Sequence, residues 1–85
     1  MPNNTEETAE RELTYGERAV GLTFNPSNDP NVQKTKEHYA FVIDLMDVIR
    51  SAPATSPEKK RLCSIAITEA QAACMWAVKA ITWQD

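Results

Sequence analysis

The stretch EKKRLCSIAITEAQAACMWAVKAITW, residues 58–83, decides the fold, because its apolar residues recur at helical spacing over its whole length. At about 100° per residue, two apolar stripes run along the predicted helix. The first stripe has mostly small side chains, which would let another helix approach closely: Cys63, Ala66, Ala70, Cys74, Ala77 and Ile81. The second stripe lies beside it and carries larger ones: Leu62, Ile65, Ala73, Trp76, Ala80 and Trp83.

Two long helices are predicted, and both begin at a proline. Ser56 as N-cap and Pro57 as first residue predict a helix to about residue 82. An earlier helix is predicted from Pro30 to about Arg50, with apolar residues at helical spacing: Val32, Tyr39, Val42, Ile43, Met46 and Ile49. A short proline-containing loop joins the two, so the sequence predicts an all-α fold with an antiparallel helical hairpin.

A single hairpin has only one internal interface and cannot cover both stripes of its second helix. The remaining apolar face predicts that the chain associates with copies of itself. We therefore expect a helical homo-oligomer.

The N-terminal third is predicted to be less regular. Residues 1–14 are polar with four glutamates, and we expect them to be disordered or frayed. Residues 15–29 contain both glycines, and we expect an irregular segment with a short extended piece at Val20–Phe24. The hairpin domain would then comprise residues 15–85.

Composition narrows the function. The 85 residues carry a net charge of −3, which argues against general binding to nucleic acid polymers or anionic membranes but leaves room for a small anion. No apolar run approaches the roughly 18 residues of a membrane span. Cys63 and Cys74 would lie about 16 Å apart on one helix, too far for a disulfide, and free thiols suggest a reducing cytoplasm.

No catalytic or metal-binding set stands out. Asp44 and Asp47 are at i,i+3 but are best interpreted as solvated carboxylates, and His38 has no evident nucleophile partner. There is no C-x-x-C motif for zinc and no glycine-rich phosphate loop. We expect a protein without enzymatic activity, metal or cofactor.

The stretch TFNPSNDPNVQK, residues 23–34, admits two interpretations. Local signal favours a helix start, with Asn28 or Asp29 as N-cap and Phe24 as a hydrophobic staple. Alternatively, polar residues ahead of a helix N-terminus bind an anion, helped by lysines that follow. Under that hypothesis Asn25, Ser27 and Asn28 supply the polar groups, and Lys34 and Lys36 supply the charge. Phe24 and Tyr39 give a flat surface for a base.

A polar stripe on the second helix is similarly ambiguous. Arg61, Ser64 and Thr68 lie within about 60° of one another on the helix surface. Sequence alone favours a solvated arginine with two helix-compatible hydroxyls. Facing a symmetry axis, however, several copies of the stripe would surround one ligand with donors.

Two segments, RAVGLTFNPSNDPNVQKTKEHYAFVIDLM and EKKRLCSIAITEAQAACMWAVKAITW, resemble a family of small phage proteins. These are the hairpin-domain nucleotide sponges, known as anti-CBASS and anti-Thoeris proteins. The similarity covers about Arg18 to Trp83, and its most specific parts are VGLTFNPS at 20–27, Lys36, IAIT at 65–68 and MWAVKA at 75–80.

The resemblance implies a function in the host bacterial cytoplasm. It implies a non-enzymatic homo-oligomer, typically a hexamer, that sequesters cyclic dinucleotides, cyclic trinucleotides or cyclic ADP-ribose isomers without cleaving them. The rival interpretation is a structural or interaction protein, a helical oligomer that docks a partner through apolar helix faces.

The resemblance also assigns roles by position. Lys36 would meet a ligand phosphate, Phe24 and Asn25 would belong to the pocket loop, and Arg18 would join them. Arg61 and Thr68, with Ser64 between them, would form a separate trinucleotide site. The stacking aromatic is left open between Phe24 and the more distant Tyr15.

Overall fold

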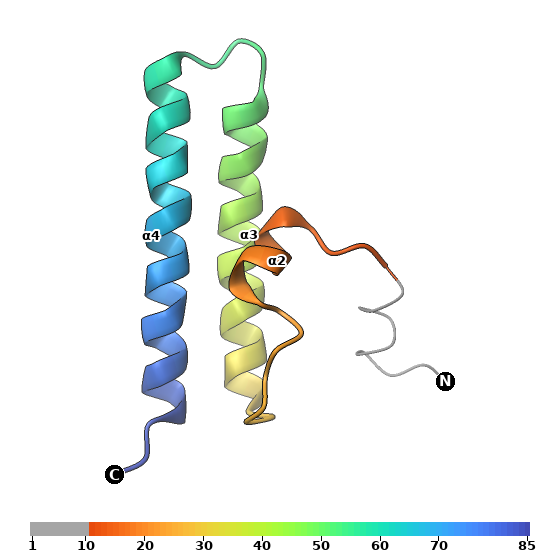
Figure 1. Ribbon diagram of the computed structural model, residues 1–85, viewed down its shortest axis with the longest axis vertical. Coiled ribbons are helices and arrows are strands. Elements are labelled where there is room, and N and C mark those ends of the chain that lie inside the picture. Colours follow the sequence, from red (N-terminus) through yellow and green to blue (C-terminus); the bar gives the residue numbers. More distant parts are fainter. Residues whose placement is uncertain (1–10) are drawn as a thin grey trace.

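The computed structural model describes residues 11–85, in which three helices follow one another: α2 (Tyr15–Val20), α3 (Pro30–Ser51) and α4 (Pro57–Thr82). The labels are those of Figure 1, where α3 and α4 run side by side in opposite directions and α2 lies against α3. The predicted helical hairpin is confirmed, and each long helix begins and ends within about one residue of its predicted bounds.

Predicted caps set the starts of the long helices, and of the two candidates for α3, Asn28 and Asp29, the cap is Asp29. The side chain of Asp29 accepts a hydrogen bond from the Asn31 N–H at 2.8 Å, and Ser56 Oγ accepts one from the Lys59 N–H at 3.2 Å. Pro30 and Pro57 occupy first-turn positions, where a missing N–H costs no helical hydrogen bond.

The prediction of an irregular segment over residues 15–29 is wrong for Tyr15–Val20, which form α2. The predicted extended piece at Val20–Phe24 is also wrong, because the end of α2 and a turn occupy these residues. Thr14 and Glu17 form a capping box: Thr14 Oγ1 accepts from the Glu17 N–H at 3.1 Å, and Glu17 Oε1 accepts from the Thr14 N–H at 2.9 Å. Gly21 ends the helix in the left-handed conformation (φ 66°), which glycine adopts without strain. The T-x-x-E spacing followed by glycine is the sequence signal for this helix.

Arg11 reinforces that N-terminus. Its guanidinium pairs with both carboxylate oxygens of Glu17 at 2.8 and 2.7 Å. This pairing, opposed by partial burial and supported by the Thr14 bonds, lowers the pKa of Glu17 to about 2. Of residues 1–14, for which we expect disorder or fraying, residues 1–10 lie outside the described residues.

Two charged side chains of α3 fasten the two ends of α2. The Gly16 N–H donates to Asp44 Oδ1 at 2.7 Å at the N-terminal end, and Lys36 Nζ donates to the Gly21 carbonyl at 2.9 Å at the C-terminal end. A carboxylate at the N-terminus and an ammonium at the C-terminus both complement the helix dipole. The start of α2 contacts Asp44 and its end contacts Lys36, which comes earlier in α3, so α2 runs antiparallel to α3.

A small core lies between the three helices. Its buried residues are Leu22, Val32, Ala40, Ile43, Cys63, Ile67 and Cys74. Cys63 and Cys74 belong to the small-residue stripe predicted for α4, and the other members of that stripe are half-buried. The helix–helix seam is therefore the first stripe, with Ile67 as a core residue that neither predicted stripe contained.

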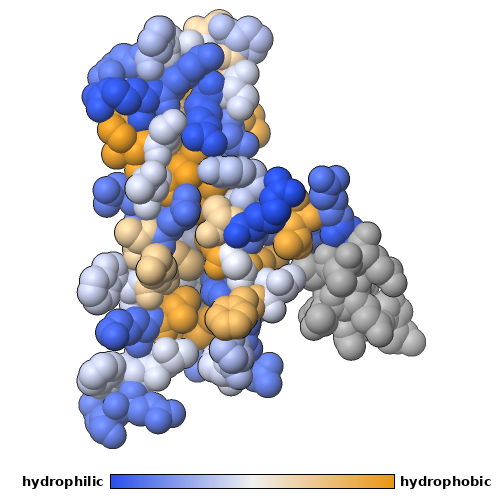
Figure 2. All heavy atoms as spheres, viewed as in Figure 1, coloured by the Kyte–Doolittle hydropathy of each residue, from blue (hydrophilic) through white to orange (hydrophobic). Residues whose placement is uncertain are grey.

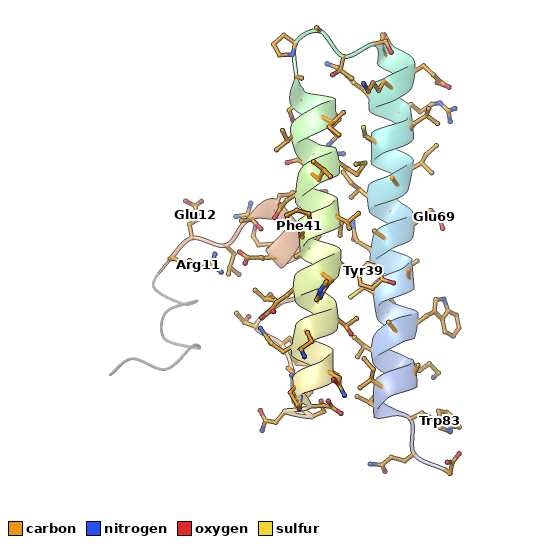
Figure 3. All side chains as sticks on the ribbon, turned by 180° about the vertical axis from the view of Figure 1, so that it is seen from behind. Arg11, Glu12, Tyr39, Phe41, Glu69 and Trp83 are labelled. Carbon is orange, nitrogen blue, oxygen red and sulfur yellow. The ribbon has the colours of Figure 1, made fainter. Side chains whose placement is uncertain are left out.

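The second stripe of α4 stays exposed, as the single interface of a hairpin requires. Leu62, Ile65, Trp76 and Trp83 keep 52%, 43%, 70% and 63% of their surface accessible. Figure 3 shows Trp83 at the free end of α4, and Figure 2 shows apolar surface on the face that carries α2, both above and below that helix. An exposed apolar face of this kind is typical of a protein interface.

Among residues 11–85, no helix is long and apolar enough to cross a membrane.

We predict that Gly16→Ala destabilises the protein by about 3 kcal/mol. A Cβ at this position would overlap the Ala40 carbonyl and lie 2.9 Å from Asp44 Oδ1, so α2 must move off α3. Urea unfolding followed by circular dichroism measures the effect. In the matched control, Gly21→Ala, the added Cβ meets only ordinary van der Waals contacts at 4.0 Å, and the variant should lose about 1 kcal/mol through its left-handed backbone. Equal losses would contradict the close approach at Gly16.

Candidate ligand-binding site

Lys36 is the buried charged residue at the junction of the three helices, with 7% of its surface exposed. Its ammonium donates to the carbonyls of Gly21 and Phe24, which end α2 and follow it. The ion pairs found among residues 11–85 are Arg11–Glu17, Asp47–Arg50 and Glu58–Arg61, so in the described chain no carboxylate pairs with Lys36. A buried cation whose partners are neutral carbonyls still attracts an anion.

A cavity of about 270 Å³ opens beside the Lys36 side chain. Its wall comes from all three helices: Ala19 and Val20 of α2, Lys36 of α3, and Gln71, Cys74, Met75 and Val78 of α4. Burial raises the pKa of the Cys74 thiol, while nearby Lys36 opposes the rise. The thiol therefore stays neutral at neutral pH and is a poor nucleophile.

The loop between α2 and α3 brings Phe24 to Lys36 but uses its other polar groups internally. The Phe24 ring is 71% exposed, and Lys36 Nζ lies 5.6 Å from its centroid. Ser27 Oγ donates to Asn25 Oδ1 at 2.7 Å and accepts from the Asp29 N–H, while Asn25 Nδ2 donates to the Asp29 carbonyl at 3.1 Å. Asn25 and Ser27 thus have a structural role in shaping the start of α3, and a ligand would have to compete for them.

Tyr39, another predicted pocket residue, lines a different cavity. This one, of about 490 Å³, is open and is bordered by Asn31, Lys34, Thr35, His38 and Tyr39 of α3 and Ala77 of α4. Figure 3, seen from behind, places Tyr39 between α3 and α4, on the face opposite to α2. Within one chain, Tyr39 and Lys36 therefore do not share a pocket. Arg18 lies exposed on α2 and has no place in the wall of either cavity.

The residues expected at a trinucleotide site do not all have the same surroundings in the single chain. Arg61 is exposed and pairs with Glu58 through two bonds of 2.7 and 2.8 Å, and Thr68 is exposed. Ser64 is half-buried, and its hydroxyl accepts a hydrogen bond from Arg50 Nη1 at 3.2 Å. Arg61 and Thr68 remain available on the outside of α4, whereas Ser64 contacts α3.

Arg50 itself is a residue that the sequence interpretation missed. Its guanidinium carbon lies 5.3 Å from the centroid of the Tyr15 ring, and its Nε donates to Asp47 at 2.9 Å. With Ser64 it therefore links all three helices. Its hydrogen bond to the Asp47 carboxylate raises the pKa of Arg50. Tyr15 is thus engaged at the end of α2 that lies far from Lys36.

No group of three or more His, Cys, Asp or Glu side chains within residues 11–85 could hold a metal ion.

The fold and this site define a small helical hairpin whose short preceding helix closes a lysine-lined cavity. The family model for the Acb2/Tad1 hairpin domain matches residues 17–82, and the chain belongs to this family. Among curated proteins and among solved structures, no significant match to the chain was found. The family is known for cyclic-nucleotide sponges, which are not catalytic. The family assignment made from the sequence is confirmed.

We predict that Lys36→Met lowers the free energy of unfolding by about 2 kcal/mol without any ligand, because hydrogen bonds from a charged donor to two carbonyls are lost. Chemical unfolding measures this. Lys34→Met, on the exposed side of the same helix, is the matched control and should unfold like wild type. A Lys36→Met protein as stable as the control would show that the ammonium does not hold α2.

Proposed function

We propose that this protein is a phage anti-defence sponge that binds cyclic oligonucleotide immune messengers and sequesters them intact. The observation that carries the proposal is Lys36, a buried ammonium without a carboxylate partner in the described chain, at the edge of a cavity. Family membership supplies the class of ligand. Sequestration would keep the messenger from the host effectors of CBASS or Thoeris defence in the bacterial cytoplasm.

The charge distribution supports a small phosphate ligand better than a nucleic acid polymer. The chain carries a net charge of −3, so its surface as a whole repels an extended polyanion. A local cation in a sheltered position favours a compact anion, because a charge-assisted hydrogen bond strengthens when water is excluded. The exposed Phe24 ring, already against Lys36, offers a surface on which a base could stack.

The site of one chain is incomplete for such a ligand. The cavity of about 270 Å³ is smaller than the roughly 300–1,000 Å³ of typical pockets for drug-sized ligands, and a cyclic dinucleotide is at least of that size. We propose that further copies of the chain complete the pocket and bring in Arg18, Asn25, Ser27 and Tyr39. This arrangement would unite residues that lie apart in a single chain.

The exposed second stripe of α4 supports self-association. It presents two tryptophans and two aliphatic side chains in one line, and nothing in the described chain covers them. We propose a homo-oligomer, a hexamer by analogy with the family. Arg61, Ser64 and Thr68 of several copies would meet near an axis and bind a cyclic trinucleotide.

The same exposed face also favours a second candidate function, an oligomeric interaction protein that docks a host or phage partner. Its anchors would be apolar, so its activity would not depend on Lys36.

The retention of intact nucleotide tests the proposal. We predict that the protein, incubated with cyclic GMP–AMP, cyclic tri-AMP and cyclic ADP-ribose and then freed of unbound ligand, releases at least one of them unchanged on heating. Chromatography with mass spectrometry identifies the product. Lys36→Met should lose the Lys36-dependent ligand while still folding. Release of cleaved nucleotide would indicate an enzyme, and retention of none would reject the sponge.

We further predict that Trp76→Glu shifts the protein to a smaller species in size-exclusion chromatography with light scattering, because a buried carboxylate at an apolar interface is costly. Lys60→Glu, exposed near the start of the same helix, serves as the control and should keep the wild-type mass. A monomeric wild type, or an unchanged Trp76→Glu oligomer, would contradict the proposed interface.

A further inference from the structure

A second polar side chain borders the Lys36 cavity. Gln71 of α4 contributes to its wall, and apart from the Cys74 thiol the remaining wall is aliphatic or thioether in character. We propose that the Gln71 amide donates a hydrogen bond to the same phosphodiester that Lys36 holds, so that the cavity is a single-phosphate subsite. This inference rests on the proposed function, since it names a further ligand contact in that site.

The hydrogen-bonding state of Lys36 leaves one donor for the ligand. An ammonium has three N–H groups, and two of them point to the carbonyls of Gly21 and Phe24. The third N–H has no hydrogen-bond partner among the described residues, so Lys36, which lines the cavity, keeps one donor for an anion. Lys36 can therefore bind a phosphoryl oxygen without releasing α2, which would keep the cavity wall in place while the ligand binds.

The Gln71 amide is similarly available. Within residues 11–85 it makes no side-chain hydrogen bond, whereas the amide of Gln33, on α3, donates to Glu37 Oε1 at 3.3 Å. Gln71 is half-buried, so a ligand that fills the cavity would cut its amide off from water. Covering the amide without giving it a hydrogen-bond partner would weaken ligand binding, so the ligand is expected to supply that partner.

Charge and size favour a phosphate as that partner. Lys36 and Gln71 both line this one cavity, and phosphoryl oxygens accept several hydrogen bonds at once. A volume of about 270 Å³ admits one phosphate with part of its nucleoside, not a complete cyclic dinucleotide. The rest of the ligand must leave the cavity past its rim, where Met75 is 74% exposed.

Two substitutions test the role of Gln71 against one matched control. Gln71→Met keeps the length of the side chain without its amide, Gln71→Glu replaces the donor with a carboxylate, and Gln33→Met alters a glutamine that lines neither cavity. Isothermal titration calorimetry with cyclic GMP–AMP, cyclic tri-AMP and cyclic ADP-ribose gives the dissociation constants, and thermal unfolding without ligand verifies that each variant folds.

We expect Gln71→Met to weaken binding of the Lys36-dependent ligand about 10-fold, the loss of one hydrogen bond to a charged group. Gln71→Glu should bind more weakly still, because its carboxylate repels the phosphate, and Gln33→Met should bind like wild type. A folded Gln71→Glu variant with wild-type affinity would overturn the inference while leaving the sponge function intact. If wild-type protein bound none of the three nucleotides, the proposed function would fail first.

Discussion

The ammonium of Lys36 is the interaction on which the rest of the structure depends. It closes the C-terminal end of α2 against α3, opposite the Asp44 carboxylate at the other end, and so holds a six-residue helix that is too short to be stable alone. The placement of α2 in turn creates the third wall of the cavity. A single buried charge therefore fixes both the fold of the N-terminal segment and the chemistry of the candidate site.

This dual role has a consequence for function. A buried lysine paired with a carboxylate would be neutralised, but carbonyl partners satisfy its hydrogen bonds and leave its charge for a ligand. The cavity is sheltered but small, and the second apolar stripe of α4 remains uncovered. A pocket shared between copies of the chain would account for both features, since association would bury the stripe and extend the cavity.

Much of the fold could be predicted from local signals. Prolines, with a cap at Asn28 or Asp29 for α3 and at Ser56 for α4, located both long helices, although the choice of Asp29 needed the structure. Spacing on α4 separated the buried stripe from the exposed one. The helix α2 was missed because its glycines were interpreted as loop residues, although Thr14 and Glu17 form a recognisable capping box.

The site was less predictable, because its residues meet through tertiary contacts. Burial of Lys36, the contact of Arg50 with Tyr15 and Ser64, and the position of Gln71 opposite α2 all depend on how the helices pack. Residue type alone likewise could not show that Asn25 and Ser27 bond to each other or that Tyr39 faces a separate cavity.

The most direct test of the central claim is to observe the Lys36 ammonium itself. Nuclear magnetic resonance of 15N-labelled lysine side chains can follow the Lys36 Nζ resonance while a cyclic nucleotide that the protein retains is titrated in. The resonance is assigned by its absence from the Lys36→Met spectrum. We predict a shift of the Lys36 signal that saturates with the ligand, while the signal of Lys59, which is exposed and lines neither cavity, stays in place. Saturating ligand binding with an unchanged Lys36 resonance would contradict it.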